Sequence, residues 1–148
     1  MLNNTMKKII DEIDEQEKNF GGNIFERTKR TDEDDINHFE HWLSKYSKAD
    51  MHEYIDFVKY LNGLNFNGLF IYSLDEHCDY DIYESNETRW ENEEQKEYIF
   101  LGDDSISWYC LDKNTGKYFI LDKPSGDIME EYKTYHEMMI KALKNCLG

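Results

Sequence analysis

The amino-acid sequence predicts one α+β domain over residues 1–148, with N-terminal helices and a C-terminal helix packed on a mainly antiparallel sheet. Apolar residues recur at helical spacing near both ends of the chain, whereas β-branched and aromatic runs separated by Gly- and Asn-containing turns occupy the middle. Helices segregated from strands in this way are typical of α+β proteins. Aromatic residues make up 15% of the chain, enough to supply a substantial core.

Three helices are predicted before the first strand. The first covers residues 5–18, with an apolar face made of Met6, Ile9, Ile10 and Ile13. Thr31 is expected to cap the second helix, with Asp34 where a capping box places a carboxylate. The third is expected to begin at Asp50 and to end at Asn62-Gly63, because Asn and Gly tolerate the left-handed conformation of a C-cap.

The rest of the chain is predicted to form strands on either side of an acidic segment. One strand covers Phe66–Leu74, and residues 75–97 form a loop followed by a short helix around Glu87–Lys96. Turn residues then divide the chain into four strands, at Tyr98–Leu101, Ile106–Asp112, Tyr118–Asp122 and Asp127–Tyr132. The closing helix has an apolar stripe made of Tyr135, Met138, Met139, Ala142 and Cys146.

The charge balance limits the classes of partner. The formal net charge is −15, from 32 acidic and 17 basic residues. A field of this sign repels phosphate backbones and anionic lipid headgroups, so we expect neither a nucleic-acid partner nor a membrane partner. It attracts basic proteins and raises their association rate. The alternative is that the charge serves only solubility, because net charge does not by itself identify a partner.

The cysteines and the N-terminus indicate an intracellular protein. Cys78, Cys110 and Cys146 are an odd number without a CxxC pair, which favours reduced thiols over a disulfide framework. No run approaches the roughly 18 apolar residues of a membrane span. The N-terminus turns acidic at Asp11 and lacks the apolar stretch of a signal peptide. We therefore expect a soluble, cytoplasmic protein.

No residue pattern indicates catalysis or metal binding. His38 and His41 could share a helix face, but zinc needs three or four converging ligands, and HExxH is absent. His77-Cys78 are sequence neighbours, which rarely align as base and nucleophile. Neither Asp79–Glu84 nor Asp112–Gly116 matches a calcium-binding loop, and the nucleophile-elbow and phosphate-loop motifs are missing. We expect no metal, no cofactor and no enzymatic activity.

Ten acidic residues fall within residues 75–97, against Arg89 and Lys96 as the basic ones. Three aromatic residues stand among them, where a fully solvated segment would not need them. They either attach the segment to its own domain or serve as buried anchors of an interface with a polar rim. On the second interpretation the partner-binding surface consists of Asp75, Glu76, Asp79, Tyr80, Asp81, Tyr83, Glu84, Glu87, Trp90, Glu91 and Glu94.

Several segments match a known arrangement: two helices and a strand in the first half, then a strand, a central hairpin and a closing helix in the second. They are Thr31–Leu43, His52–Leu61 with Asn62-Gly63, Phe66–Leu74, Tyr98–Asp103, Trp108–Asp112 with Thr115-Gly116, and the closing helix with Tyr135 and Leu143. On these segments, over about residues 31–147, the chain resembles the SUKH superfamily, which contains the Smi/Knr-type regulators and many bacterial immunity proteins. Asn65–Leu69 and Leu121–Gly126 most resemble its YrhA-like bacterial branch.

The resemblance implies a protein that binds and neutralises the toxin domain of a polymorphic bacterial toxin. Many such toxins are nucleases with basic active sites, and an acidic inhibitor would be attracted to such a surface. The alternative that the resemblance implies is a regulatory protein-interaction module of the Smi/Knr type with no toxin partner. A toxin gene immediately upstream would favour the first interpretation.

Overall fold

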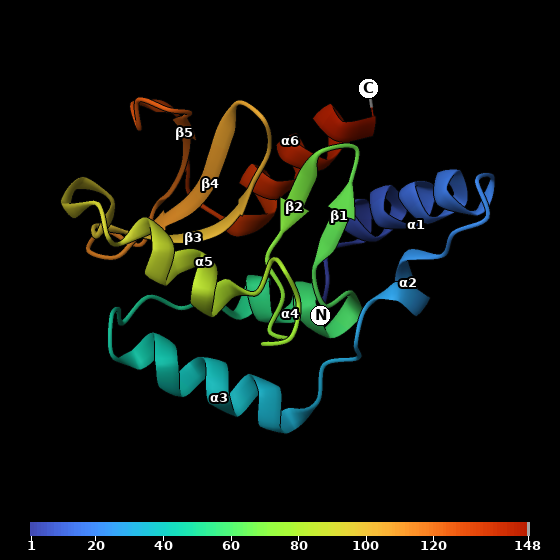
Figure 1. Cartoon of the computed structure of the whole chain (residues 1–148), viewed down its shortest axis with the longest axis horizontal. Helices are drawn as coiled ribbons and strands as arrows, with labels where there is room; N and C mark the ends of the chain where they lie inside the picture. Colours follow the sequence, from blue (N-terminus) through green and yellow to red (C-terminus); the bar gives the residue numbers. More distant parts are fainter. Residues whose placement is uncertain (148) are drawn as a thin grey trace.

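The computed structural model describes residues 1–147, and it has the predicted α+β architecture (Figure 1). The helices are α1 (Asn4–Lys18), α2 (Ile24–Arg27), α3 (Glu33–Ser44), α4 (His52–Tyr60), α5 (Ile82–Arg89) and α6 (Tyr135–Leu147), with a 3₁₀ turn, η1, at Glu93–Gln95. The strands are β1 (Leu64–Phe66), β2 (Leu69–Ile71), β3 (Tyr98–Asp103), β4 (Ser107–Asp112), β5 (Tyr118–Asp122) and β6 (Ile128–Tyr132).

The six strands form one antiparallel sheet in sequential order, from β1 at one edge to β6 at the other. β2 pairs with β3 at only two positions, Phe70 with Asp103 and Ile71 with Gly102. One further backbone hydrogen bond, from the Tyr72 N–H to the Leu101 carbonyl at 2.9 Å, extends this pairing. From Ser73 onward the chain turns away from β3, and Figure 1 shows α5 beside β3 on this part of the sheet. The short β2–β3 pairing therefore leaves room for α5.

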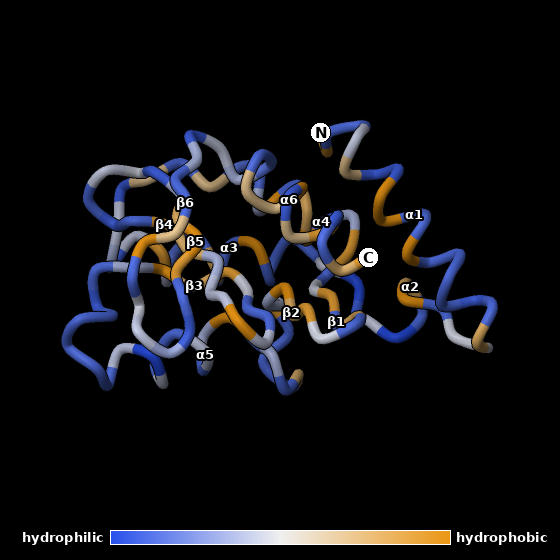
Figure 2. Tube along the Cα trace, turned by 90° about the horizontal axis from the view of Figure 1, so that it is seen from above, coloured by the Kyte–Doolittle hydropathy of each residue, from blue (hydrophilic) through white to orange (hydrophobic). Residues whose placement is uncertain are grey.

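Helices cover the sheet on both sides. Tyr135 of α6 packs against Tyr118 of β5, with ring centroids 6.1 Å apart. On the side of α5, Trp42 of α3 stacks on Trp90, with centroids 5.7 Å apart, and so joins α3 to α5. Figure 2 shows hydrophobic residues concentrated along the strands and hydrophilic residues in the outer loops. The core thus lies between the sheet and its helices.

The predicted helix over residues 5–18 is confirmed, whereas the predicted cap of the next helix is shifted by one residue. Asp32, not Thr31, is the N-cap of α3, and it forms a capping box with Asp35, not with Asp34. The Thr31 hydroxyl donates instead to the carbonyl oxygen of Val58. Thr31 therefore joins α3 to α4, and the adjacent carboxylate takes over the cap.

The single strand predicted over residues 66–74 is confirmed only in part: Leu69–Ile71 is β2, but a turn separates it from Phe66, the last residue of β1. Asn67 and Gly68 have positive φ angles of 48° and 83° and form this two-residue turn. Asn-Gly is the preferred pair for such a turn, because both positions need the left-handed conformation. The four strands predicted after residue 97 are confirmed to within two residues at each end.

The helix predicted around Glu87–Lys96 is wrong in position. α5 begins at Ile82, because the Asp81 side chain accepts a hydrogen bond from the Glu84 N–H at 2.8 Å and caps the helix. It ends at Arg89, and residues near the predicted helix end form η1. α5 therefore lies within the acidic segment and orients its side chains.

Candidate functional site

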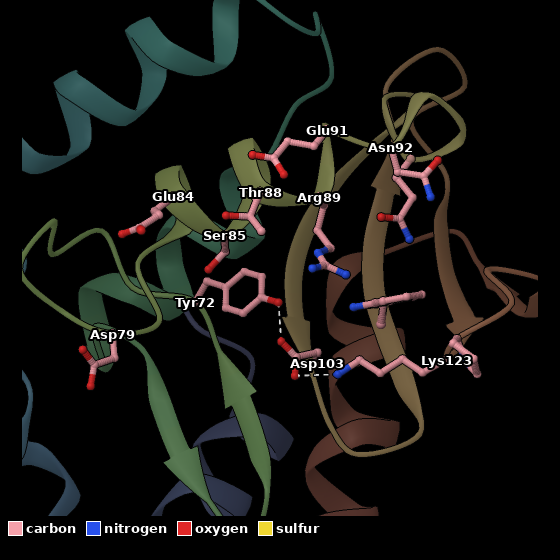
Figure 3. A pocket seen from close by; sticks show the side chains of 13 residues that line it. Tyr72, Asp79, Glu84, Ser85, Thr88, Arg89, Glu91, Asn92, Asp103 and Lys123 are labelled. Carbon is pink, nitrogen blue, oxygen red and sulfur yellow. Dashed lines mark hydrogen bonds and ion pairs between the residues drawn. The ribbon is translucent and has the colours of Figure 1, made fainter.

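A cleft of about 890 Å³ opens between α5 and the sheet (Figure 3). One wall comes from the acidic segment and the opposite side from β3, β4 and the loops at their ends. The residues that line the cleft are Tyr72, Asp79, Glu84, Ser85, Thr88, Arg89, Glu91, Asn92, Gln95, Asp103, Trp108, Lys123 and Pro124.

Buried polar contacts hold α5 against the sheet. The Asn86 side chain donates to the Phe100 carbonyl at 2.9 Å and accepts from the Phe100 N–H at 2.6 Å. Asn86 is completely buried. The helix is thereby fixed in rotation, with Ser85, Thr88 and Arg89 lining the cleft.

Asp103 connects the two sides of the cleft floor. Its carboxylate accepts a hydrogen bond from the Tyr72 hydroxyl and lies 2.9 Å from Nζ of Lys123. Lys123 also donates to the Asp104 carbonyl at 2.7 Å. Burial, together with the Asp103 carboxylate, raises the pKa of Tyr72 far above its ordinary value. The Tyr72 hydroxyl therefore stays protonated and acts as a donor.

Trp108 forms an aromatic surface beneath two cations. The Arg89 guanidinium lies 5.5 Å from the centroid of the Trp108 ring, and Nζ of Lys123 lies 5.6 Å from it. Such distances are within the range of cation–π attraction. The cleft floor is therefore positively charged and aromatic, in a protein whose net charge is −15.

The rim of this cleft is acidic. Of the predicted partner-binding residues, Asp79, Glu84 and Glu91 are exposed and line the cleft. We call these three residues the acidic rim. Glu87 and Glu94 are exposed on the same segment but do not line the cleft. Carboxylates around a concave surface can bind the cationic side chains of a partner.

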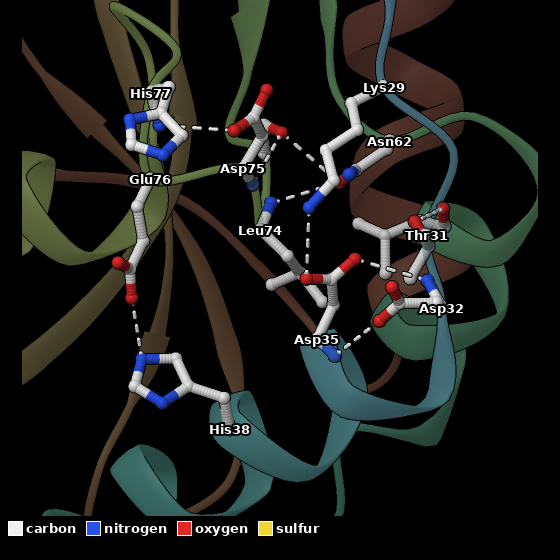
Figure 4. A network of polar contacts seen from close by, with 12 residues as sticks. Lys29, Thr31, Asp32, Asp35, His38, Asn62, Leu74, Asp75, Glu76 and His77 are labelled. Atoms are coloured by element: carbon white, nitrogen blue, oxygen red, sulfur yellow. Dashed lines mark hydrogen bonds and ion pairs between the residues drawn. The ribbon is translucent and has the colours of Figure 1, made fainter.

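Other acids of the predicted surface have intramolecular roles, and Figure 4 shows two of them, Asp75 and Glu76. Glu76 is exposed, and its Oε1 lies 2.7 Å from Nε2 of His38 on α3. Asp75 accepts a hydrogen bond from the His77 N–H at 3.0 Å. Asp81 is buried at the start of α5, and this burial raises the pKa of its carboxyl group. These three acids organise the segment around the cleft.

The three aromatic residues of the predicted surface differ in exposure. Tyr83 is buried, and its ring lies against Trp42. Trp90 is half-buried, and its Nε1 donates to the Tyr98 carbonyl at 2.7 Å. Tyr80 is half-buried against Phe70, and burial raises its pKa to about 12. Tyr83 and Trp90 thus attach the segment to its own domain, as one of the two interpretations predicted.

Tyr80 also lines a second hollow of about 400 Å³ beside the cleft. Phe70 lines it as well, and Tyr72, Asp79, Ser85 and Asp103 line both hollows. Among the three predicted aromatic anchors, Tyr80 therefore has the position best suited to contact an occupant of the cleft.

The residues of the cleft floor were not identified from the sequence. Tyr72, Asp103 and Lys123 come from the ends of β2, β3 and β5, and only the sheet pairing brings them together. Trp108 lies in the predicted strand Ile106–Asp112, and it is 7% exposed. The one residue of the cleft floor that the sequence could have indicated is Arg89, because it is one of only two basic residues in an otherwise acidic segment.

Residues 1–147 contain no group of three or more His, Cys, Asp and Glu side chains arranged to hold a metal ion. Within the same range, no helix is long and apolar enough to cross a membrane.

The comparisons with known proteins support the fold. No protein-family model matches the chain, and no curated protein matches it. A crystal structure of a protein from Pseudomonas syringae pv. tomato has a similar fold, with a TM-score of 0.56 and 18% sequence identity. The similarity covers 84% of this chain and 90% of the Pseudomonas chain. At this level of identity it shows a shared α+β fold.

Proposed function

We propose that the protein is a cytoplasmic immunity protein that binds a basic toxin domain through the acidic rim and the cleft, without catalysing a reaction. The observation that carries the proposal is the exposure of Asp79, Glu84 and Glu91 around a concave site with an aromatic floor. Interfaces commonly combine a polar rim with a more apolar centre that contains aromatic residues. The resemblance to the SUKH superfamily supplies the toxin as the class of partner.

Electrostatic attraction supports the proposed choice of partner. A net charge of −15 attracts a basic protein over a range set by the salt concentration. Partner cations at the acidic rim would replace water at exposed carboxylates, which carries a small desolvation cost. The rim would therefore affect mainly the association rate, and the cleft floor would supply contacts within the complex.

The proposal can be tested with two charge-matched triple variants. The first combines Asp79→Lys, Glu84→Lys and Glu91→Lys. The second combines Glu12→Lys, Glu15→Lys and Glu40→Lys, three exposed acids on α1 and α3. The partner is captured from the native cell with the tagged full chain, and its affinity for the wild type and both variants is measured at low and high salt. Rescue of growth is then scored when the partner is co-expressed with each protein.

We expect the rim variant to lose about tenfold or more in affinity, most of it in the association rate, and to lose rescue. The control variant should retain most of the affinity and the rescue. Equal affinity of the two variants would exclude the acidic rim as the binding surface. A partner that is not toxic when expressed alone would contradict the immunity role and favour the regulatory alternative.

A further inference from the structure

Within the described residues 1–147, Arg89 is a cation without a carboxylate partner, in a strongly acidic protein. Seven of the other sixteen Lys and Arg side chains have one: Lys18, Lys29 and Lys123, for example, pair with the carboxylates of Asp14, Asp35 and Asp103. Within residues 1–147, the Arg89 guanidinium forms neither an ion pair nor a hydrogen bond, and it lies over Trp108. Figure 3 shows its side chain directed into the cleft.

The other charged groups on the cleft floor are already bonded to one another. Asp103 accepts from Tyr72 and pairs with Lys123, and Lys123 also donates to the Asp104 carbonyl. The positive charge of Lys123 is thus balanced, whereas that of Arg89 is not. This difference leaves Arg89 free to pair with a group from outside the chain.

Further donors stand beside Arg89 on the same helix. The hydroxyl groups of Ser85 and Thr88 line the cleft, and within residues 1–147 neither forms a hydrogen bond. A guanidinium offers two parallel N–H groups to a carboxylate, and nearby hydroxyl groups can donate to the remaining lone pairs. The arrangement on α5 therefore suits a planar, singly charged anion.

We propose that Arg89 binds a carboxylate side chain of the protein partner, while the acidic rim binds basic side chains that flank this carboxylate in the partner. The proposal rests on the proposed function and specifies its site. A phosphate group would carry a larger negative charge toward Asp103, Glu84 and Glu91 and would be repelled more strongly. A small free carboxylate, such as acetate, would be repelled by the negative charge of the acidic rim, because it brings no cations to neutralise that charge. The recognised segment therefore contains Glu or Asp between Lys or Arg residues.

The test uses two peptides that differ in one group, acetyl-Lys-Lys-Glu-Lys-Lys-amide and acetyl-Lys-Lys-Gln-Lys-Lys-amide. Each is titrated into the ¹⁵N-labelled full chain, with acetate and inorganic phosphate as further probes. The resonances followed are the Arg89 Nε–H, the Trp108 indole N–H and the backbone amides of Glu84 and Glu91. The proteins are the wild type, Arg89→Gln, Arg89→Lys and the exposed control Arg30→Gln, each first checked for a native spectrum.

We expect the wild type and Arg30→Gln to bind the glutamate peptide about tenfold more tightly than the glutamine peptide, as one charge-assisted pair provides. Arg89→Gln should abolish this preference. Arg89→Lys should reduce it, because the lysine ammonium lacks the two parallel N–H donors of the guanidinium. Acetate should bind far more weakly than the glutamate peptide.

Three results would overturn the role of Arg89. They are equal binding of both peptides by the wild type, an undiminished preference in Arg89→Gln, or binding of acetate or phosphate at Arg89 as tight as that of the glutamate peptide. If the two peptides bind equally and still shift the Glu84 and Glu91 amides, only the role of Arg89 is contradicted, and the proposed function is still supported. If neither peptide shifts these amides, the cleft does not bind a basic segment. That result would also contradict the proposed function, which places the binding of a basic partner in this cleft.

Discussion

The side chain of Asn86 on α5 is bonded to both backbone polar groups of Phe100 on β3. It donates to the Phe100 carbonyl at 2.9 Å and accepts from the Phe100 N–H at 2.6 Å. It donates as well to the Ile82 carbonyl one turn earlier, at 2.7 Å. Because β2 has already separated from β3 at this position, the amide group of Asn86 replaces the missing strand. The same contact sets the position of α5 and thus the wall of the cleft.

Asn86→Ala should lower the free energy of unfolding by about 2–4 kcal/mol, because each buried polar group left unpaired costs about 1–3 kcal/mol. Chemical denaturation of the purified protein measures this change. Asn37→Ala is the control, since Asn37 is exposed on α3 and its side chain forms no hydrogen bond within residues 1–147. The control should change stability by no more than about 0.5 kcal/mol. Equal midpoints for the two variants would contradict the role of Asn86.

The helices with broad apolar faces could be predicted from the sequence, whereas α5 could not be placed correctly. α1 buries Met6, Ile9, Ile10 and Ile13, so its periodicity is clear. α5 buries Ile82, Tyr83 and the polar Asn86, and a polar core residue does not contribute to an apolar pattern. The β1–β2 turn was missed because Asn67-Gly68 stands inside an apolar run.

The candidate site could be predicted only in part. A high density of acids is visible in the sequence and located the segment that carries the acidic rim. The cleft floor depends on strand pairing, which places Asp103 of β3 beside Tyr72 and Lys123 from distant parts of the chain. Trp108 has the spacing of a core residue, and the same side chain also lines the cleft. A single sequence does not contain these long-range relations.

Gly102→Ala should push β2 away from β3 and destabilise the protein. A methyl group at this position would lie 2.5 Å from the Phe70 carbonyl oxygen, which is backbone and cannot rotate away. Overpacking of this kind costs about 1–3 kcal/mol. Thermal unfolding measures the effect, and the Tyr72–Asp103 contact beside Gly102 should weaken with it.

Gly22→Ala is the matched control for Gly102→Ala. Its added methyl group would meet Oε2 of Glu17 at 2.8 Å, the flexible end of a side chain that can move. We expect a smaller loss of stability for Gly22→Ala than for Gly102→Ala. The reverse order would show that β2 and β3 separate without cost at Gly102.

His136 should make the protein less stable as the pH falls below about 6.5. Burial lowers the pKa of His136 in the folded state, although Glu53 and Asp56 oppose this effect; His52 and the N-terminal amine lower it further. The unfolded chain therefore binds more protons than the folded protein in this range, so the free energy of unfolding rises with pH. His136→Gln should reduce the slope of stability against pH below about pH 6.5.

The exposed His41 provides the comparison for this slope. Denaturation curves of the wild type, His136→Gln and His41→Gln are recorded at several pH values in one buffer series. His41→Gln controls for the replacement of a histidine by glutamine at an exposed position. A steeper slope in His136→Gln would mean that the attraction of Glu53 outweighs burial.

Trp90→Phe should lower stability without weakening the partner affinity of the folded protein. The change removes the donor to the Tyr98 carbonyl and reduces the stack on Trp42, at a cost of about 1–3 kcal/mol. Tyr46→Phe is the control, because it keeps the ring 4.6 Å from Trp90 and removes only a hydroxyl group without a hydrogen bond within residues 1–147. Denaturation and partner titration are measured on the same samples. A loss of affinity in a fully folded Trp90→Phe protein would instead make Trp90 an interface anchor, because an intramolecular side chain contributes to binding only through the fold.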